Sequence, residues 1–132
     1  MSYALMVLTA AHVLPAVFWA GSTFVLARMS GAGAERLAFP QLGAALVAAA
    51  AGAGLWGFAH RGGFGPTEWT LAAGAACALT ALAIQASALP AVRRLSASPE
   101  AGGTRRRIVL SQRLAAGLLV VAVLCMSAAR YA

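Results

Sequence analysis

His12 is the side chain in this sequence most able to do chemistry, because it stands alone as an ionisable group within a long apolar run, residues 4–27. At about 1.5 Å per residue, such a run crosses the hydrocarbon core of a bilayer as one helix, and His12 lies about 12 Å along it. Ionisable side chains inside a membrane span are costly and mark functional sites by default. Because histidine carries protons and binds haem iron or copper, we predict that His12 is a metal ligand or a proton carrier.

Trp19 shares the predicted helix face of His12, together with the hydroxyl residues Thr9 and Thr23, at 100° per residue. This face predicts a pocket that is turned toward the other helices, with His12 and Trp19 against a bound cofactor. The alternative is a packing role, in which His12 hydrogen-bonds to a neighbouring helix.

His60 is a second candidate metal ligand, and Glu68 follows it across a glycine-rich loop. Glu68 can reach either histidine, but His12 and His60 should differ in depth by about 8–12 Å, so a shared site needs a tilted or unwound helix. The alternatives are a hydrated interfacial His60 and a Glu68 that stabilises the start of the third helix through its dipole.

Arg113 is a second charged side chain within an apolar run, about 7.5 Å beyond Ile108. We predict that it pairs with Gln85 at a similar depth, or with an anionic group such as a haem propionate or a lipid phosphate. Gln41 and Gln112 add to the same inner polar layer. The alternative is that Arg113 extends toward the membrane surface.

The composition places these residues in a membrane protein. Of the 132 residues, 61% are hydrophobic, and ten arginines stand against three glutamates. Continuous apolar runs of about 19–24 residues each predict one integral membrane domain, residues 1–132, that is all-α. We expect a four-helix transmembrane up-down bundle with spans at 4–27, 41–59, 69–92 and 108–129. The net charge of +7 comes from arginines at the ends of these runs, so we predict lipid bilayer contact and no nucleic-acid partner.

The arginines also predict an orientation. Two of them flank the first loop and five flank the third loop: Arg28, Arg36, Arg93, Arg94, Arg105, Arg106 and Arg107. Only Arg61 and Arg130 belong to the opposite side. The excess places the first and third loops in the cytoplasm, so both termini should lie outside it.

Several local features complete the predicted bundle. Pro40 is expected at the start of the second helix, Thr67 at the N-terminal cap of the third, and residues 96–104 in a polar, flexible loop. Gly52 and Gly54 are expected at a helix–helix contact, because small residues let helices approach closely.

The segment HVLPAVFWAGSTFVLAR, residues 12–28, resembles the first helix of the HemJ-type membrane protoporphyrinogen oxidases and of CopD-like copper-resistance membrane proteins. The matching features are His12, Trp19, the pair Ala20–Gly21 and Arg28. The resemblance implies a small four-helix scaffold in a bacterial-type inner membrane. It also implies haem b with His12 as an axial ligand, and a quinone or porphyrin as partner.

These observations favour a haem-binding membrane redox protein, and hence a membrane oxidoreductase. One alternative is a copper-handling membrane protein, with copper in place of haem. The other is a non-enzymatic accessory or assembly subunit, since helices rich in alanine and glycine pack well within homo-oligomers or larger membrane complexes. The sequence contains no motif for hydrolase or kinase chemistry.

Overall fold

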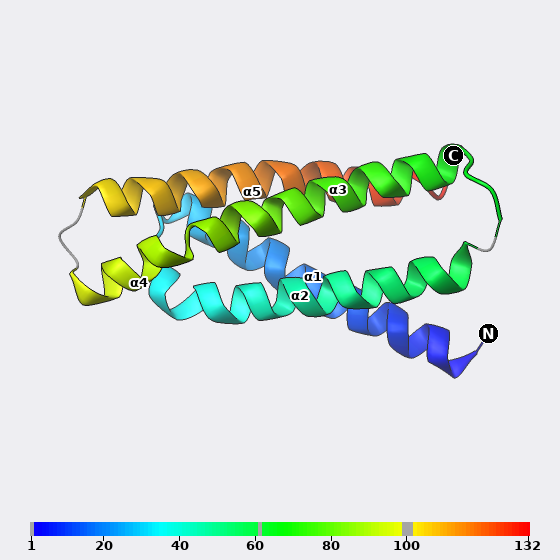
Figure 1. Ribbon diagram of the computed structural model, residues 1–132, viewed down its shortest axis with the longest axis horizontal. Coiled ribbons are helices and arrows are strands. Elements are labelled where there is room, and N and C mark those ends of the chain that lie inside the picture. The colour runs from blue at the N-terminus through cyan, green and yellow to red at the C-terminus, as the bar shows by residue number, and fades with distance from the viewer. Residues whose placement is uncertain (1, 61, 99–101) are drawn as a thin grey trace.

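The computed structural model describes residues 2–60, 62–98 and 102–132, and its regular elements are all α-helices: α1 (Tyr3–Arg28), α2 (Ala34–Ala59), α3 (Pro66–Ser87), α4 (Leu89–Ala97) and α5 (Gly102–Ala128) (Figure 1). α3 and α4 follow one another across a break at Ala88 and count as one apolar segment, Pro66–Ala97. The five helices therefore supply four segments long and apolar enough to cross a membrane. The predicted all-α four-helix membrane bundle is confirmed.

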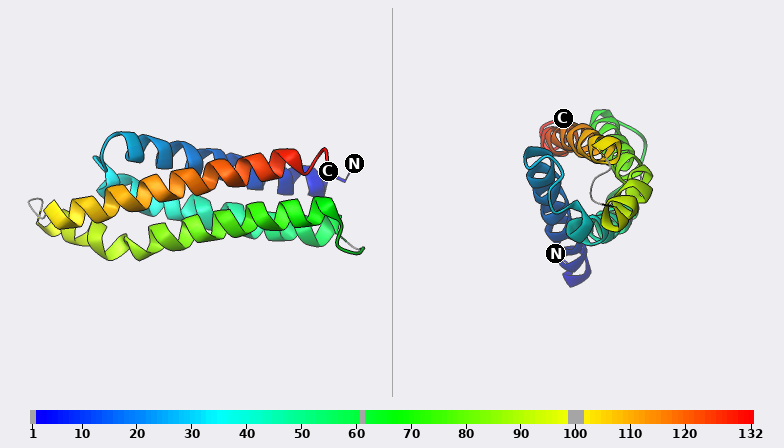
Figure 2. Two further views of the ribbon diagram at one scale, coloured as in Figure 1. Left: turned by 90° about the horizontal axis from the view of Figure 1, so that it is seen from above. Right: turned by 90° about the vertical axis from the view of Figure 1, so that its left-hand side faces the viewer.

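The four segments run alternately up and down. Both termini lie at the end where α2 is followed by α3, and the turn between α1 and α2 lies at the opposite end (Figures 1 and 2). We call the first the termini end. We call the second the arginine end, because it carries Arg28 and Arg36 of the first turn and the arginines of α4 and early α5.

The buried core is concentrated toward the arginine end and the middle of the bundle. α1 packs along α2 and α3 packs along α5, while α2 and α3 touch over a short stretch only. In α1, every buried residue lies between Trp19 and Leu26. One core cluster joins Leu26 to Val92 and Ile108, and a second joins Trp19 to Leu119. The N-terminal part of α1 projects beyond the ring formed by the other helices (Figure 2).

Each helix pair stays closely packed toward the termini end because glycines face the partner helix. A Cβ atom on Gly74 of α3 would lie 3.0 Å from Cβ of Cys125 and 3.1 Å from the carbonyl oxygen of Ala122 on α5. A Cβ on Gly54 of α2 would lie 3.1 Å from Leu8 of α1. The two pairs, α1–α2 and α3–α5, are thus each tight in this half, while α2 and α3 touch over a short stretch only. The predicted helix–helix contact of Gly54 is confirmed.

Two local predictions about helix starts are wrong. α2 begins at Ala34, so Pro40 lies inside the helix rather than at its start. Gly31 and Gly33, with φ of 76° and 86°, make the tight turn from which α2 starts earlier than expected. α3 begins at Pro66, and Thr67 therefore follows the cap position instead of filling it.

The expected loop 96–104 is also shorter than predicted. α4 stays helical as far as Ala97, which lies in the predicted loop. The reason is that Ala91, Val92 and Leu95 are buried against the core of the arginine end. Pro90 lacks a backbone N–H, which explains the break just before α4. α5 already begins at Gly102, and residues 99–101 of the predicted loop lie outside the described residues.

Candidate functional site

His12 lies between α1 and α2. Its Nδ1 is 2.7 Å from the carbonyl oxygen of Ala48, in α2, and the side chain is half-buried. Because a carbonyl oxygen only accepts, Nδ1 must carry the proton and donate it. The imidazole is thereby fixed as the tautomer whose Nε2 has a free lone pair.

The ring of His12 occupies space that only a glycine on α2 leaves open. A Cβ atom on Gly52 would lie 2.9 Å from Cε1 and 3.1 Å from Nδ1 of His12. The predicted helix–helix contact of Gly52 is therefore confirmed, and the side chain it contacts is the candidate ligand itself. Within the described chain, Nε2 makes no hydrogen bond and no buried side-chain nitrogen lacks a partner, so Nε2 is at the accessible side of the ring.

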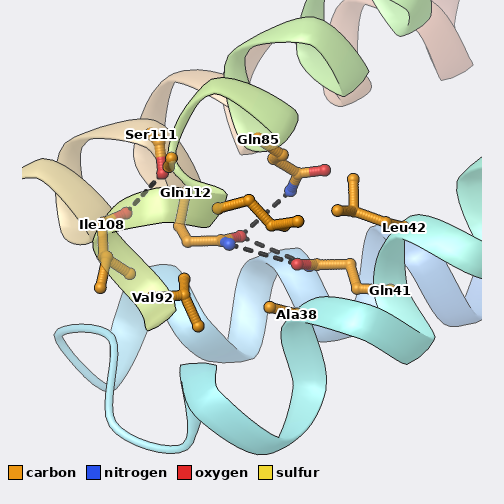
Figure 3. Close-up of a pocket in the computed structure, with 10 residues that line it drawn as sticks. Ala38, Gln41, Leu42, Gln85, Val92, Ile108, Ser111 and Gln112 are labelled. Carbon is orange, nitrogen blue, oxygen red and sulfur yellow. Dashed lines mark hydrogen bonds between the residues drawn. The ribbon is translucent and has the colours of Figure 1, made fainter. Parts of the chain in front are cut away.

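A second polar site joins all four spans nearer the arginine end, and it is built from three glutamines. Gln41, Gln85 and Gln112 come from α2, α3 and α5, and all three are buried. Gln41 Nε2 donates to Gln112 Oε1 at 3.3 Å, Gln112 Nε2 donates back to Gln41 Oε1 at 3.2 Å, and Gln85 Nε2 donates to Gln112 Oε1 at 3.1 Å (Figure 3). We call this group, with Trp19 and Thr23 of α1, the glutamine layer.

α1 sets the direction of every amide in the glutamine layer. The indole Nε1 of Trp19 can only donate, and it lies 2.6 Å from Gln85 Oε1. Thr23 donates its hydroxyl proton to the carbonyl oxygen of Trp19 at 2.7 Å, so its oxygen accepts from Gln41 at 2.8 Å and from Gln85 at 3.0 Å. The cavity beside these amides is about 10 Å³, close to the minimum for one water molecule. The glutamine layer is thus a nearly closed network rather than a ligand pocket.

The structure separates His12 from Trp19, which the sequence placed on one face. Trp19 bonds into the glutamine layer, while His12 bonds to α2 at Ala48. Ala48 is seven residues from Gln41, so the two sites lie about 10 Å apart along the bundle. Trp19 is 4% exposed, and it therefore acts as a core residue beneath the level of His12 and does not line a shared pocket.

Arg113 is not part of the polar layer. It is exposed, while its neighbour Gln112 is buried and bonded to Gln41. The predicted pairing of Arg113 with Gln85 is not formed, because the amide of Gln85 is fully engaged with Trp19, Thr23 and Gln112. Arg113 also faces outward from α5, at the level of the glutamine layer and not at that of His12.

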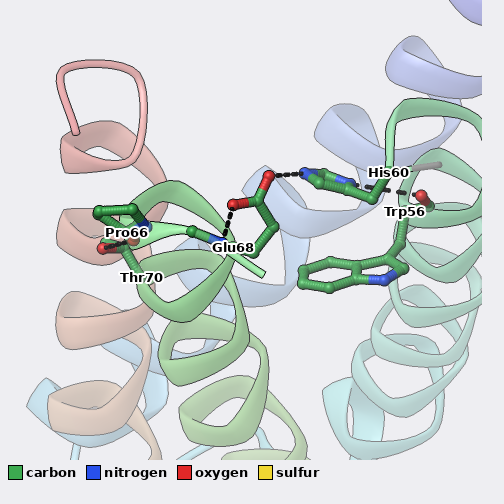
Figure 4. A network of polar contacts seen from close by, with 6 residues as sticks. Trp56, His60, Pro66, Glu68 and Thr70 are labelled. Carbon is green, nitrogen blue, oxygen red and sulfur yellow. Dashed lines mark hydrogen bonds and ion pairs between the residues drawn. The ribbon is translucent and has the colours of Figure 1, made fainter. Parts of the chain in front are cut away.

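His60 and Glu68 meet at the termini end, where α2 leads into α3. His60 Nε2 lies 3.6 Å from Glu68 Oε1, and Glu68 Oε2 accepts the backbone N–H of Gly65 at 2.8 Å (Figure 4). The ring of His60 also stacks on Trp56, with centroids 4.5 Å apart. Glu68 thus caps α3 and binds the nearer histidine.

His12 and His60 do not form one site. His12 contacts α2 between Ala48 and Gly52, and His60 follows the end of the same helix. A separation of 8–12 residues corresponds to about 12–18 Å along α2. The described residues contain no group of three or more His, Cys, Asp and Glu side chains that could hold a metal ion.

Sequence reasoning placed the three glutamines in one layer but missed two features. The acceptor of His12 is a backbone carbonyl, which leaves no trace in the residue types of α2. The central role of Trp19 in orienting the amides was also missed, although a buried indole N–H usually finds an acceptor.

Comparison with protein-family models, curated proteins and solved structures finds no match, so the function has to be inferred from these contacts.

Proposed function

We propose that this chain is a small membrane redox protein, of the HemJ and CopD-like type, that binds haem b through His12. The contact that carries the proposal is the hydrogen bond from His12 Nδ1 to the carbonyl oxygen of Ala48, at 2.7 Å. Histidines that ligate metals almost always donate their second ring N–H to a carbonyl or a carboxylate in this way. The bond fixes the tautomer and directs Nε2 as the ligating atom.

The surroundings of His12 are compatible with a large apolar ligand. From Tyr3 to Phe18, α1 has no buried residue, and α2 and α3 touch over a short stretch only. Apolar side chains such as Val13 and Leu14 are exposed at the level of His12, on other faces of α1. A porphyrin needs apolar surface and one positioned ligand, and this half of the chain offers both.

The described residues supply one histidine to this site. His60, the other histidine of the chain, lies about 12–18 Å away along α2. Bis-histidine ligation within one chain is therefore incompatible with the geometry, and His12 would be the one histidine of this chain to hold haem b. When bound, haem b supplies one-electron redox chemistry; the protein supplies the ligand, its orientation and a water-poor environment.

The membrane setting of the proposal follows from the charges. We place the arginine end in the cytoplasm of a bacterial-type cell and both termini outside the inner membrane. His12 then lies in the outer half of the bilayer, where a quinone or a porphyrin dissolved in the membrane is the expected redox partner.

The absorption spectrum of the detergent-purified protein, expressed with haem precursors, tests the proposal. We expect a Soret band of high-spin character, because one side chain ligates the iron. His12→Ala should abolish the band while the protein still inserts, and His60→Ala, the matched control, should keep it.

Two outcomes overturn the proposal. Wild-type protein without a Soret band, even after reconstitution with haem, removes haem from the proposal and leaves copper handling or an accessory role in a membrane complex. Metal analysis separates these two, because only the first retains copper. A band that survives His12→Ala moves the ligand elsewhere.

A further inference from the structure

Two arginines of α5 lie on the side of the helix that faces away from the bundle. The buried side of α5 is formed by Ile108, Gln112, Ala115 and Leu119. Arg106 and Arg113 are seven residues apart, so they share one face at 100° per residue, and that face is opposite the buried one. Both are exposed, as is Leu110 between them.

Arg113 needs a counter-charge that the described residues do not provide. It lies six residues beyond Arg107, or about 9 Å deeper along the span. A guanidinium at that depth is costly unless it is paired or reaches the interface. The described chain shows no hydrogen bond or ion pair for Arg106 or Arg113, whereas Arg107 donates to the carbonyl oxygen of Ser87 at 3.1 Å.

The geometry of α5 directs Arg113 toward Arg106. Side chains on an α-helix lean toward its N-terminus, and α5 begins at the arginine end. The two Cα atoms are about 10 Å apart, so two long side chains can reach one group lying between their levels. The guanidinium fork suits the oxygens of a phosphate.

We propose that Arg106 and Arg113 bind the phosphate of one anionic glycerophospholipid, with its acyl chains along α5. Leu110 provides apolar contact on the same face, and Gly117 leaves open space below Arg113, since a Cβ there would meet no atom within 4 Å. The neighbouring exposed Arg105 and Arg107 favour a net anionic headgroup over a zwitterionic one, because a choline amine would be repelled there.

Native mass spectrometry of the detergent-solubilised full chain tests this site, with phosphatidylglycerol and phosphatidylcholine as probes. Wild type should retain phosphatidylglycerol preferentially. Arg113→Gln and Arg106→Gln should each weaken its retention on the order of fivefold, the usual weight of one arginine near an anionic lipid surface. Arg130→Gln removes the same charge at the termini end and should leave retention unchanged.

Three results would overturn the site. The first is equal retention of phosphatidylglycerol and phosphatidylcholine by the wild type. The second is an equal loss of phosphatidylglycerol retention in Arg130→Gln and Arg113→Gln. The third is a change of oligomeric state in Arg113→Gln without any change in lipid binding. The last result would mean that Arg113 pairs with another copy of the chain. Haem plays no part in this measurement, so its outcome is independent of the function proposed for His12.

Discussion

Adding one methyl group at Gly52 should disturb His12 directly. In Gly52→Ala, the new Cβ would stand 2.9 Å from Cε1 and 3.1 Å from Nδ1 of the imidazole. Real Cβ atoms essentially never approach a neighbour that closely, so the ring must shift. Because Nδ1 is held on the carbonyl oxygen of Ala48 at 2.7 Å, the shift lengthens or breaks that hydrogen bond.

The size of the effect follows from one stabilising term and two destabilising terms. Replacing glycine by alanine within a helix stabilises it by about 0.5–1 kcal/mol. Overpacking at a tight contact costs about 1–3 kcal/mol, and a lost interhelical hydrogen bond in a membrane costs about 0.6 kcal/mol on average. Gly43 is on the same helix, and a Cβ there meets nothing within 4 Å. Gly43→Ala therefore has only the stabilising effect of alanine in a helix. We expect Gly52→Ala to be less stable than Gly43→Ala by about 2–4 kcal/mol, the sum of the two costs.

Equilibrium unfolding in mixed micelles, with rising denaturing detergent, measures this difference. The same pair of substitutions in a His12→Ala background completes a double-mutant cycle. With the ring removed, the new methyl group has space, so the two glycine variants should agree within about 0.5 kcal/mol. Haem retention by Gly52→Ala should fall as well, because the ligand is displaced.

Equal stability of Gly52→Ala and Gly43→Ala in the wild-type background would refute the contact between His12 and α2. A difference that persists unchanged in the His12→Ala background would refute its assignment to the imidazole. The first result would also remove support for the Ala48 bond and for the orientation of Nε2 inferred from it.

Two other parts of the structure can be tested with single changes. Gln85→Leu should lower the free energy of unfolding by about 1–3 kcal/mol, because the buried indole N–H of Trp19 loses its acceptor. Adding Trp19→Phe to this variant should recover part of the lost stability, and no recovery would contradict the hydrogen bond between Trp19 and Gln85. A reporter active only in the cytoplasm should give no signal when fused to the C-terminus and a strong signal when inserted in the turn at residues 29–33; the reverse pattern would invert the orientation.

The membrane spans could be predicted from the sequence because lipid imposes a simple condition. Backbone groups in a bilayer must be satisfied within the segment, so continuous apolar runs can only be helices. Residue counting also placed Gln85 and Gln112 at a similar depth near the arginine end, and Gln41, the first residue of the predicted span 41–59, was assigned to the same layer. Depth along a helix is readable from residue counting, and these predictions used nothing else.

What could not be predicted depends on geometry around the helix axis and on the backbone. The pairing of Gln85 with Trp19 rather than Arg113 depends on which side of α5 faces the core, and Arg113 lies on the opposite side from Ile108. The continuation of helix through α4 was missed because Arg93 and Arg94 suggest a polar loop. Their neighbours Ala91 and Leu95 are buried instead, so the segment is an amphipathic helix.

The contrast between the two polar sites explains why His12 is the stronger candidate for function. In the glutamine layer, neutral side chains from α1, α2, α3 and α5 satisfy one another, and the cavity beside them is about 10 Å³. Such a network fixes four helices relative to each other and leaves little capacity for a ligand. His12 makes one hydrogen bond, through Nδ1, and its second nitrogen is accessible and has no hydrogen-bond partner among the described residues. The polar groups of the glutamine layer are therefore used within the bundle, whereas Nε2 of His12 is still available to a partner.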